Sequence, residues 1–171
     1  MLKLFGPVGA GALALAAPFA FAQPAGAVLG PDAARCRSGS AEPALLVNVT
    51  GLKNRRGEIR VKVFGSDPNE FMVRGKGVRR IDVPVTGAGT MQVCIALPRA
   101  GTYALVVRHD ADDNGKTSWN DGAGYSGNPG LSLMNLKPPY KKVAVAVGNG
   151  VRPVNVVLNY RRGLSIAPIR S

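Results

Sequence analysis

Apolar and polar residues alternate along most of the chain between Ala44 and Tyr160. A period of two is typical of β-strands that bury one face, and turn-forming residues separate the alternating segments. The pattern predicts seven strands, which cover Leu45–Val49, Ile59–Val63, Ile81–Val85, Met91–Leu97, Tyr103–Val107, Val143–Val147 and Val154–Tyr160.

Seven short strands with frequent turns predict an all-β fold, and we expect a β-sandwich, with a small closed barrel as the alternative. Beyond the N-terminal segment, the strongest helical signal is Ser66-Asp67-Pro68, which favours one short turn of helix over Asp67–Met72. Pro84 and Pro153 cannot donate a ladder hydrogen bond. We therefore expect their segments at sheet edges or strand starts.

The N-terminal segment has the pattern of a cleavable signal peptide, because Lys3 precedes an uncharged apolar run that ends in Ala20-Phe21-Ala22. A retained membrane anchor is the alternative, and after processing we expect no transmembrane anchor. Export predicts a periplasmic or secreted bacterial protein. The predicted division of the chain is a signal peptide (1–22), an extended arm rich in Ala, Gly, Pro and Ser (23–43), a β-sandwich domain (44–162) and a C-terminal tail (163–171).

Cys36 and Cys94 are the only cysteines of the chain. An even number in an oxidising compartment favours a structural disulfide that pins the N-terminal arm onto a strand, and two free cysteines are the alternative. In the chain-entropy model such a loop contributes on the order of 4 kcal/mol to stability.

Twenty-two Lys and Arg against ten Asp and Glu give the chain a net charge of +12. Export argues against a nucleic-acid partner, and an aromatic content of 6% provides little surface for base stacking. Anionic envelope glycans, lipids or acidic proteins are the expected partners, whereas a solvated outer strand face is the alternative. The candidate residues for anionic-surface binding are Arg55, Arg56, Arg60, Lys62, Arg79 and Arg80.

Four of the ten acidic residues lie between Asp110 and Asp121. The polar residues there have the ligand spacing of a twelve-residue calcium loop, with Gly115 at the sixth position, so Ca²⁺ is the candidate cofactor. Asp rather than Glu at position twelve and the lack of flanking helices weaken this prediction, and a solvated turn at Asn114-Gly115 is the alternative. The expected ligands are Asp110, Asp112, Asn114, Lys116, Ser118 and Asp121.

His109 is the only histidine, and strand register places it on the apolar face of its strand. A structural, hydrogen-bonded role is therefore expected for it. Ser118 and Ser126 lie nearby, but Gly124-Tyr125-Ser126-Gly127 departs from the nucleophile elbow of hydrolases. We expect no catalytic residues and no enzymatic activity.

Several short segments occur along the chain in a recognisable order: Leu46-Val47-Asn48-Val49, Gly51-Leu52, Gly57-Glu58-Ile59, Val63-Phe64, Gly101-Thr102-Tyr103-Ala104-Leu105, His109-Asp110, Asp113-Asn114-Gly115-Lys116, Gly124-Tyr125-Ser126-Gly127-Asn128 and Pro138-Pro139. Together they resemble the bacterial domain-of-unknown-function family DUF2141, over about Ala44 to Tyr160. The resemblance implies an exported β-sandwich of immunoglobulin-like or transthyretin-like type, without an established activity. Members of this family usually have a longer stretch with Pro and Glu before the Gly-Tyr segment. In this chain Asp121-Gly122-Ala123 leads straight into Gly124-Tyr125.

These observations predict an exported β-sandwich that binds or scaffolds in the cell envelope without catalysis. The runner-up function is a calcium-binding adhesion or matrix module, and the third is a secreted hydrolase. Metal titration separates the first two, and activity-based labelling of serine tests the third.

Overall fold

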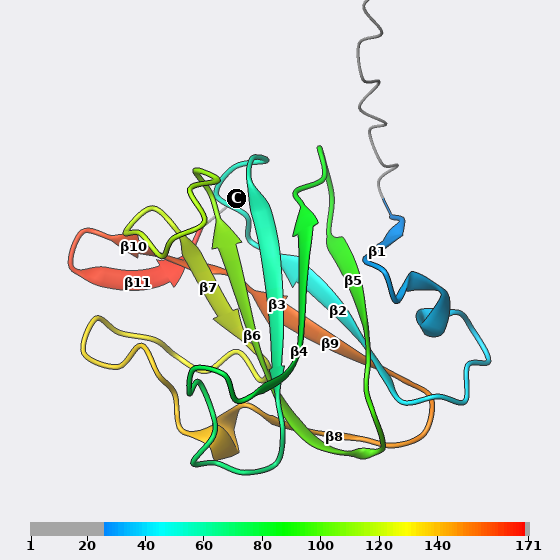
Figure 1. Cartoon of the computed structure of the whole chain (residues 1–171). Helices are drawn as coiled ribbons and strands as arrows, with labels where there is room; N and C mark the ends of the chain where they lie inside the picture. Colours follow the sequence, from blue (N-terminus) through cyan, green and yellow to red (C-terminus); the bar gives the residue numbers. More distant parts are fainter. Residues whose placement is uncertain (1–25, 170–171) are drawn as a thin grey trace, which may run out of the picture.

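A computed structural model describes residues 26–169, so the predicted signal peptide lies outside the described residues. This part of the chain is built almost entirely from strands (Figure 1). In chain order the elements are β1 (Val28–Leu29), the 3₁₀ helix η1 (Ala33–Cys36), β2 (Ala44–Thr50), β3 (Glu58–Phe64), β4 (Gly77–Pro84), β5 (Met91–Ala96), β6 (Gly101–Asp110), β7 (Gly122–Tyr125), the 3₁₀ helix η2 (Tyr140–Lys142), β8 (Ala144–Val147), β9 (Val151–Val157), β10 (Asn159–Arg162) and β11 (Ser165–Pro168).

The strands form two sheets that pack face to face. One sheet has the order β1-β5-β2-β9, and the other has the order β11-β10-β7-β6-β3-β4, with β8 also paired to β6. Most neighbours are antiparallel, but β2 pairs in parallel with β9, from Ala44 opposite Val151 to Thr50 opposite Val157. The predicted all-β sandwich is confirmed.

Alternate residues of both sheets fill a dry interior. On β6 the inward residues are Tyr103, Leu105, Val107 and His109, all buried. Burial of one large apolar side chain stabilises the fold by about 1.5–3 kcal/mol, so this interior is the main source of stability. Its central members, none more than 1% exposed, include Val47, Ile59, Val61, Met91, Ile95, Leu105, Val107, Val156 and Leu158.

All seven predicted strands are present, but the last one is two strands. β9 belongs to the four-stranded sheet, and β10 belongs to the seven-stranded sheet. The chain changes sheet at Leu158, whose backbone N–H donates to the Thr50 carbonyl at 3.0 Å. The alternation continues through the crossing because Val156, Leu158 and Tyr160 all face the same interior. For this reason the sequence pattern did not reveal the break.

The segment after β3 has turns in place of the predicted helical turn over Asp67–Met72. The Glu70 and Phe71 amides donate to carbonyls three residues earlier, and Asp67 accepts a hydrogen bond from the Asn69 amide. Met72 has a φ of 60°, outside the helical region, which ends this series of turns.

Pro84 and Pro153 lie as expected, since their strands, β4 and β9, are both edge strands.

The N-terminal arm lies along β5, because β1 extends the four-stranded sheet at that edge and η1 packs against β5 and β2. The predicted disulfide between Cys36 and Cys94 is present and fixes η1 to β5. Asp32 adds a second attachment, because its carboxylate accepts from the Ala96 amide at 2.9 Å and from Arg79 at 2.8 and 2.9 Å. These contacts outweigh burial and hold the pKa of Asp32 below its ordinary value.

The predicted C-terminal tail contains a further strand. β11 pairs with β10 from Asn159 opposite Pro168 to Arg162 opposite Ser165, so this hairpin extends the seven-stranded sheet. Among residues 26–169, no helix has both the length and the apolar character needed to span a bilayer.

Candidate functional site

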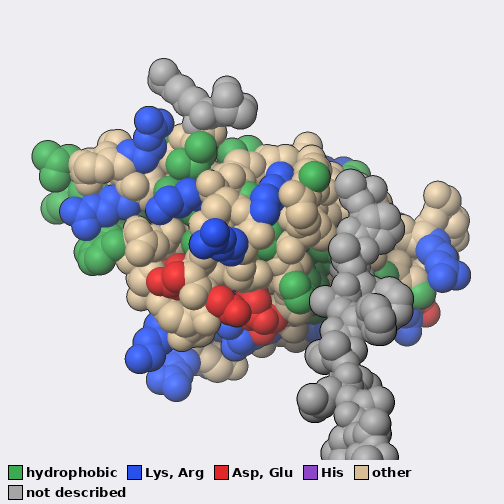
Figure 2. Space-filling model, turned by 90° about the horizontal axis from the view of Figure 1, so that it is seen from above, with side chains coloured by type: hydrophobic (Ala, Val, Ile, Leu, Met, Phe, Trp, Pro, Cys, Tyr) green, Lys and Arg blue, Asp and Glu red, His purple; other side chains and the backbone are tan. Residues whose placement is uncertain are grey.

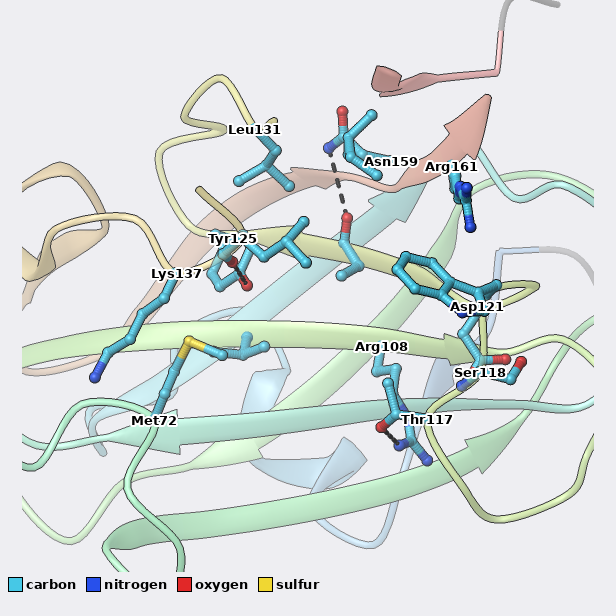
Figure 3. Close-up of a pocket in the computed structure, with 15 residues that line it drawn as sticks. Met72, Arg108, Thr117, Ser118, Asp121, Tyr125, Leu131, Lys137, Asn159 and Arg161 are labelled. Carbon is cyan, nitrogen blue, oxygen red and sulfur yellow. Dashed lines mark hydrogen bonds between the residues drawn. The ribbon is translucent and has the colours of Figure 1, made fainter. Parts of the chain in front are cut away.

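The outer face of the seven-stranded sheet carries a pocket that the sequence analysis missed. It lies over β6, β7 and β10, where Figure 3 shows Arg108, Tyr125 and Asn159, and Val106 and Ala123 of the same strands also line it. Its volume is about 620 Å³, within the range of small-molecule sites in proteins. The remaining lining residues are Met72, Thr117, Ser118, Trp119, Asp121, Leu131, Leu136, Lys137, Arg161 and Ile166.

A second, smaller apolar cluster holds one end of the pocket. The Phe64 and Phe71 rings meet edge to face at 5.4 Å, and Phe71 meets Tyr140 at 5.8 Å. The Tyr125 hydroxyl donates to the Leu136 carbonyl at 2.6 Å, and burial raises the pKa of Tyr125. The loop that provides Leu131 is thereby attached to the sheet, which gives the pocket a fixed wall.

The opposite end of the pocket is more polar. Arg108 donates to the Thr117 hydroxyl at 2.6 Å and to Asp110 at 3.3 Å, while its Nε is buried without a hydrogen-bond partner. The Arg161 guanidinium lies 4.3 Å from the centre of the Trp119 ring. Figure 3 shows Arg108, Thr117, Ser118, Asp121 and Arg161 gathered at this end.

Three of the seven exposed large apolar residues among residues 26–169, namely Met72, Trp119 and Leu136, line the pocket. Three more, Val73, Met134 and Leu164, lie within two residues of a lining residue, and the seventh is Val78 on β4. Exposed apolar side chains that gather around one pocket mark an interaction surface.

The predicted calcium loop brings three carboxylates together. Oxygen atoms of Asp110, Asp112 and Asp121 lie within 4.8 Å of one another. Two of these carboxylates also accept backbone hydrogen bonds: Asp110 from the Asn114 and Gly115 amides, and Asp121 from the Ala111 and Ser118 amides. The loop geometry is therefore maintained by the protein's own donors.

The other expected ligands of the calcium loop make local turns. The Asn114 side chain accepts from the Lys116 amide at 2.7 Å, and the Ser118 hydroxyl accepts from the Asn120 amide at 3.2 Å. Asp113 has a φ of 55°, and Gly115 has a φ of 72°, as a tight turn requires.

The six predicted basic residues do not form one uniform patch. Arg60 and Arg80 both bind Asp82, each at 2.6 Å. Arg79 is held by Asp32, and the Lys62 ammonium lies over the Phe64 ring at 4.9 Å. Arg55 and Arg56 lie in the loop before β3, apart from this strand pair.

His109 has the expected structural role. Its Nε2 lies 2.8 Å from the Arg56 carbonyl, which can only accept, so this nitrogen carries the proton. Its Nδ1 accepts from the Tyr160 hydroxyl at 2.6 Å, and that hydroxyl accepts from the Lys53 amide. Burial raises the pKa of Tyr160 to about 12. The histidine thus joins β6 to β10 inside the sandwich.

Ser126 is a structural residue as well. Its hydroxyl donates to the Val143 carbonyl at 2.5 Å and accepts from the Leu105 amide at 3.0 Å. These bonds attach the end of β7 to β6 and to the segment before β8. Among residues 26–169, Ser126 bonds to Val143 and Leu105, and His109 bonds to Tyr160 and Arg56, so these two side chains are not bonded to each other.

Two sequence signals point to the pocket once its position is known. β6 contains the unbroken apolar run Tyr103–Val107, which is expected when a strand is covered on both faces. The loop segment Leu131–Leu136 is also rich in apolar residues. Taken alone, however, the apolar run of β6 is also compatible with a half-buried strand, and the Leu131–Leu136 segment is compatible with an ordinary loop.

Comparison with known proteins identifies a family without a described activity. A family model described as "Uncharacterized protein conserved in bacteria (DUF2141)" matches residues 47–155. This match covers more than half of the chain and confirms the resemblance drawn from its residues. Neither a curated protein nor a solved structure matches the chain.

Proposed function

Since the chain belongs to the DUF2141 family, we propose that it is an exported, non-catalytic module of the cell envelope that binds a ligand in the outer-face pocket. The observation that carries this proposal is a pocket of about 620 Å³ that is lined by three of the seven exposed large apolar residues among residues 26–169, with three more within two residues of its lining. A monomer rarely exposes such side chains together without a binding role.

The position of the pocket also supports a binding role. It lies on strands that are fixed from behind by the main core, so its floor is rigid. The polar groups of the site occur on loops and strand ends, where recognition residues commonly occur. The two residues with hydrolytic potential, His109 and Ser126, are buried in structural hydrogen bonds. Binding without chemistry is therefore the function that the geometry supports best.

The pocket can be tested with Ala123→Leu, which places three more carbon atoms on its floor. We expect native mass spectrometry of the exported protein, incubated with an envelope extract, to detect a bound small molecule that this variant loses. Ala146→Leu is the matched control, because Ala146 is exposed on β8 away from the pocket. Equal ligand loading of the two variants, or an empty wild-type protein, would contradict the proposal.

A calcium-binding adhesion module is the second candidate function, and the three clustered carboxylates favour it. A Ca²⁺ concentration ten times the Kd would stabilise the protein by about 1.4 kcal/mol. Asp112→Asn replaces one of the three clustered carboxylates, and Asp113→Asn, at the next residue and outside this cluster, is the control. An unchanged melting temperature at millimolar Ca²⁺ would eliminate this function.

A further inference from the structure

The loops around the pocket project on one side of the molecule. Figure 1 shows the β10–β11 hairpin, the loop between β6 and β7 and the loop that follows β7 on the same side. Each loop carries one strongly exposed apolar side chain: Leu164 is 89% exposed, Trp119 is 67% exposed and Met134 is 97% exposed. In water these apolar side chains stay largely hydrated, apart from the face of Trp119 that Arg161 covers, whereas a lipid layer would bury them.

Basic residues accompany these apolar tips. Arg161 and Arg162 precede Leu164, Lys137 follows Met134, and Lys116 precedes Trp119. Figure 2 shows hydrophobic and basic side chains intermingled at the end of the molecule that carries the β10–β11 hairpin. This combination of apolar tips and cations is complementary to a membrane with negatively charged headgroups.

The charges inside the pocket are consistent with an anionic headgroup. Three cations, Arg108, Lys137 and Arg161, line it, against the single carboxylate of Asp121. Asp121 directs its oxygens to the Ala111 and Ser118 amides, while Arg161 and Lys137 form none of the ion pairs found among the described residues. The apolar end, with Met72, Leu131 and Leu136, has the character that an acyl chain requires.

We propose that this side of the protein docks on a bilayer that contains anionic phospholipid, and that the pocket holds one acyl chain of such a lipid. The inference rests on the proposed binding function and names the ligand class of the same pocket. Leu164 and Met134 enter the interfacial layer, and Trp119 lies at the headgroup level. Lys137 and Arg161, which form none of the ion pairs among the described residues, contact the phosphate region.

The test is binding of the exported protein to vesicles of phosphatidylcholine with and without phosphatidylglycerol. Trp119 is the only tryptophan, so its emission reports contact at the pocket directly. We expect a blue shift and protection from a water-soluble quencher with the anionic vesicles alone. Binding should weaken as salt is raised, because screening reduces the attraction between the cations and the headgroups.

Matched variants test whether vesicle binding depends on the docking side or is nonspecific adsorption. Leu164→Asp and Met134→Asp should each weaken vesicle binding by about tenfold or more, because each removes one apolar side chain from the lipid. Val78→Asp makes the same change on β4, away from the pocket, and should leave binding unchanged. Lys137→Ala should weaken binding by about fivefold. All variants carry the same N-terminus, and their melting temperatures check that each is folded.

Three results would overturn the docking proposal: equal binding to neutral and anionic vesicles, equal losses for Leu164→Asp and Val78→Asp, or no change of Trp119 emission. A soluble short-chain phosphatidylglycerol provides a further arm. If it binds the pocket while vesicles do not, the ligand is a free amphiphile and membrane docking is wrong. If neither lipid binds but Ala123→Leu still removes a ligand from the envelope extract, only this inference fails and the proposed function stands.

Discussion

The two faces of the seven-stranded sheet are made by the same strands but have different surroundings. The inner face meets the four-stranded sheet and is filled by buried residues such as Val61, Leu105 and Val107. The outer face is closed only at one end, by Phe64, Phe71 and Tyr140, and opens beyond them into the pocket. Neighbouring residues of one strand therefore serve different purposes, and substitutions at adjacent positions can separate stability from binding.

The largest expected effect is at β6. Leu105→Ala should lower the free energy of unfolding by about 3 kcal/mol, because it leaves a cavity in the fully buried interior. Val106→Ala, one residue along on the half-buried outer face, should cost about 1 kcal/mol or less. Urea denaturation of both variants measures the difference. Equal losses of stability would show that the outer face is as tightly packed as the inner face.

β7 provides the next comparison, because its glycines face inward while Ala123 and Tyr125 face outward. A Cβ atom on Gly124 would lie 2.6 Å from Val156 Cγ1 and 2.7 Å from the Val157 carbonyl oxygen. Gly124→Ala should therefore destabilise the protein by about 2 kcal/mol through overpacking.

Gly130→Ala is the matched control for this prediction, since nothing lies within 4 Å of its added Cβ and its φ is not positive. Thermal unfolding of the two variants provides the measurement. A stable Gly124→Ala protein would mean that β7 can move away from β9, and the inner face would then be less rigid than we describe.

Much of the inner face was predictable from the sequence, because alternation records which side of a strand is buried. The strand pattern placed His109 on the same face as Leu105, and the structure confirms this. The change of sheet at Leu158 was not predictable, because both strands face one interior and the alternation does not change. The bonding of Cys36 to Cys94 was predictable from their number and the expected compartment, independently of the strand pattern.

The outer-face pocket was not predictable, because its residues come from five separate segments that only the fold brings together. Tyr125 is its one lining residue within the segments that carry the family resemblance. Other residues of those segments stabilise the fold instead. The Asn128 side chain, for example, binds the backbone of β9 at Asn155 and Val157. A family resemblance therefore indicated the architecture better than the site.

A tyrosine on each face gives a pH-dependent comparison. Tyr160→Phe should cost about 1.5 kcal/mol, because the His109 Nδ1 and the Lys53 amide each lose a buried partner. The folded pKa of Tyr160 is raised from 10.0 to about 12 by burial, so the folded state retains a proton that the unfolded state loses in this range. The stability that Tyr160 contributes is complete below pH 10 and is lost as the pH rises towards 12.

Unfolding midpoints of the wild-type protein and Tyr160→Phe, measured from pH 9 to pH 12, check this behaviour. The wild-type stability should decrease more steeply above pH 10 than that of the variant, and the two curves should converge. Tyr125→Phe is the outer-face comparison: burial raises the pKa of Tyr125 too, so its loss should also flatten the curve above pH 10, but it should cost less at neutral pH because its hydroxyl bonds one loop carbonyl rather than two buried groups. Parallel curves for wild type and Tyr160→Phe would show that Tyr160 ionises freely in the folded protein.

The smallest effect is expected on the outer face of β3 and β4, where Asp82 binds both Arg60 and Arg80. Hydrogen bonds from these two arginines outweigh burial and lower the pKa of Asp82, so its contribution to stability is present above pH 3.8 and is lost as the pH falls through the folded pKa. Because the arginines are partly exposed, Asp82→Asn should cost less than about 1 kcal/mol at neutral pH.

Asp82→Asn also leaves the Arg60 and Arg80 guanidinium groups without a carboxylate. Retention of this variant on a negatively charged resin should therefore increase more than that of Asp67→Asn, which changes the net charge equally but involves an acid outside these ion pairs. Equal retention of the two variants would mean that Asp82 does not restrain the basic residues of this face, and high salt should abolish any difference.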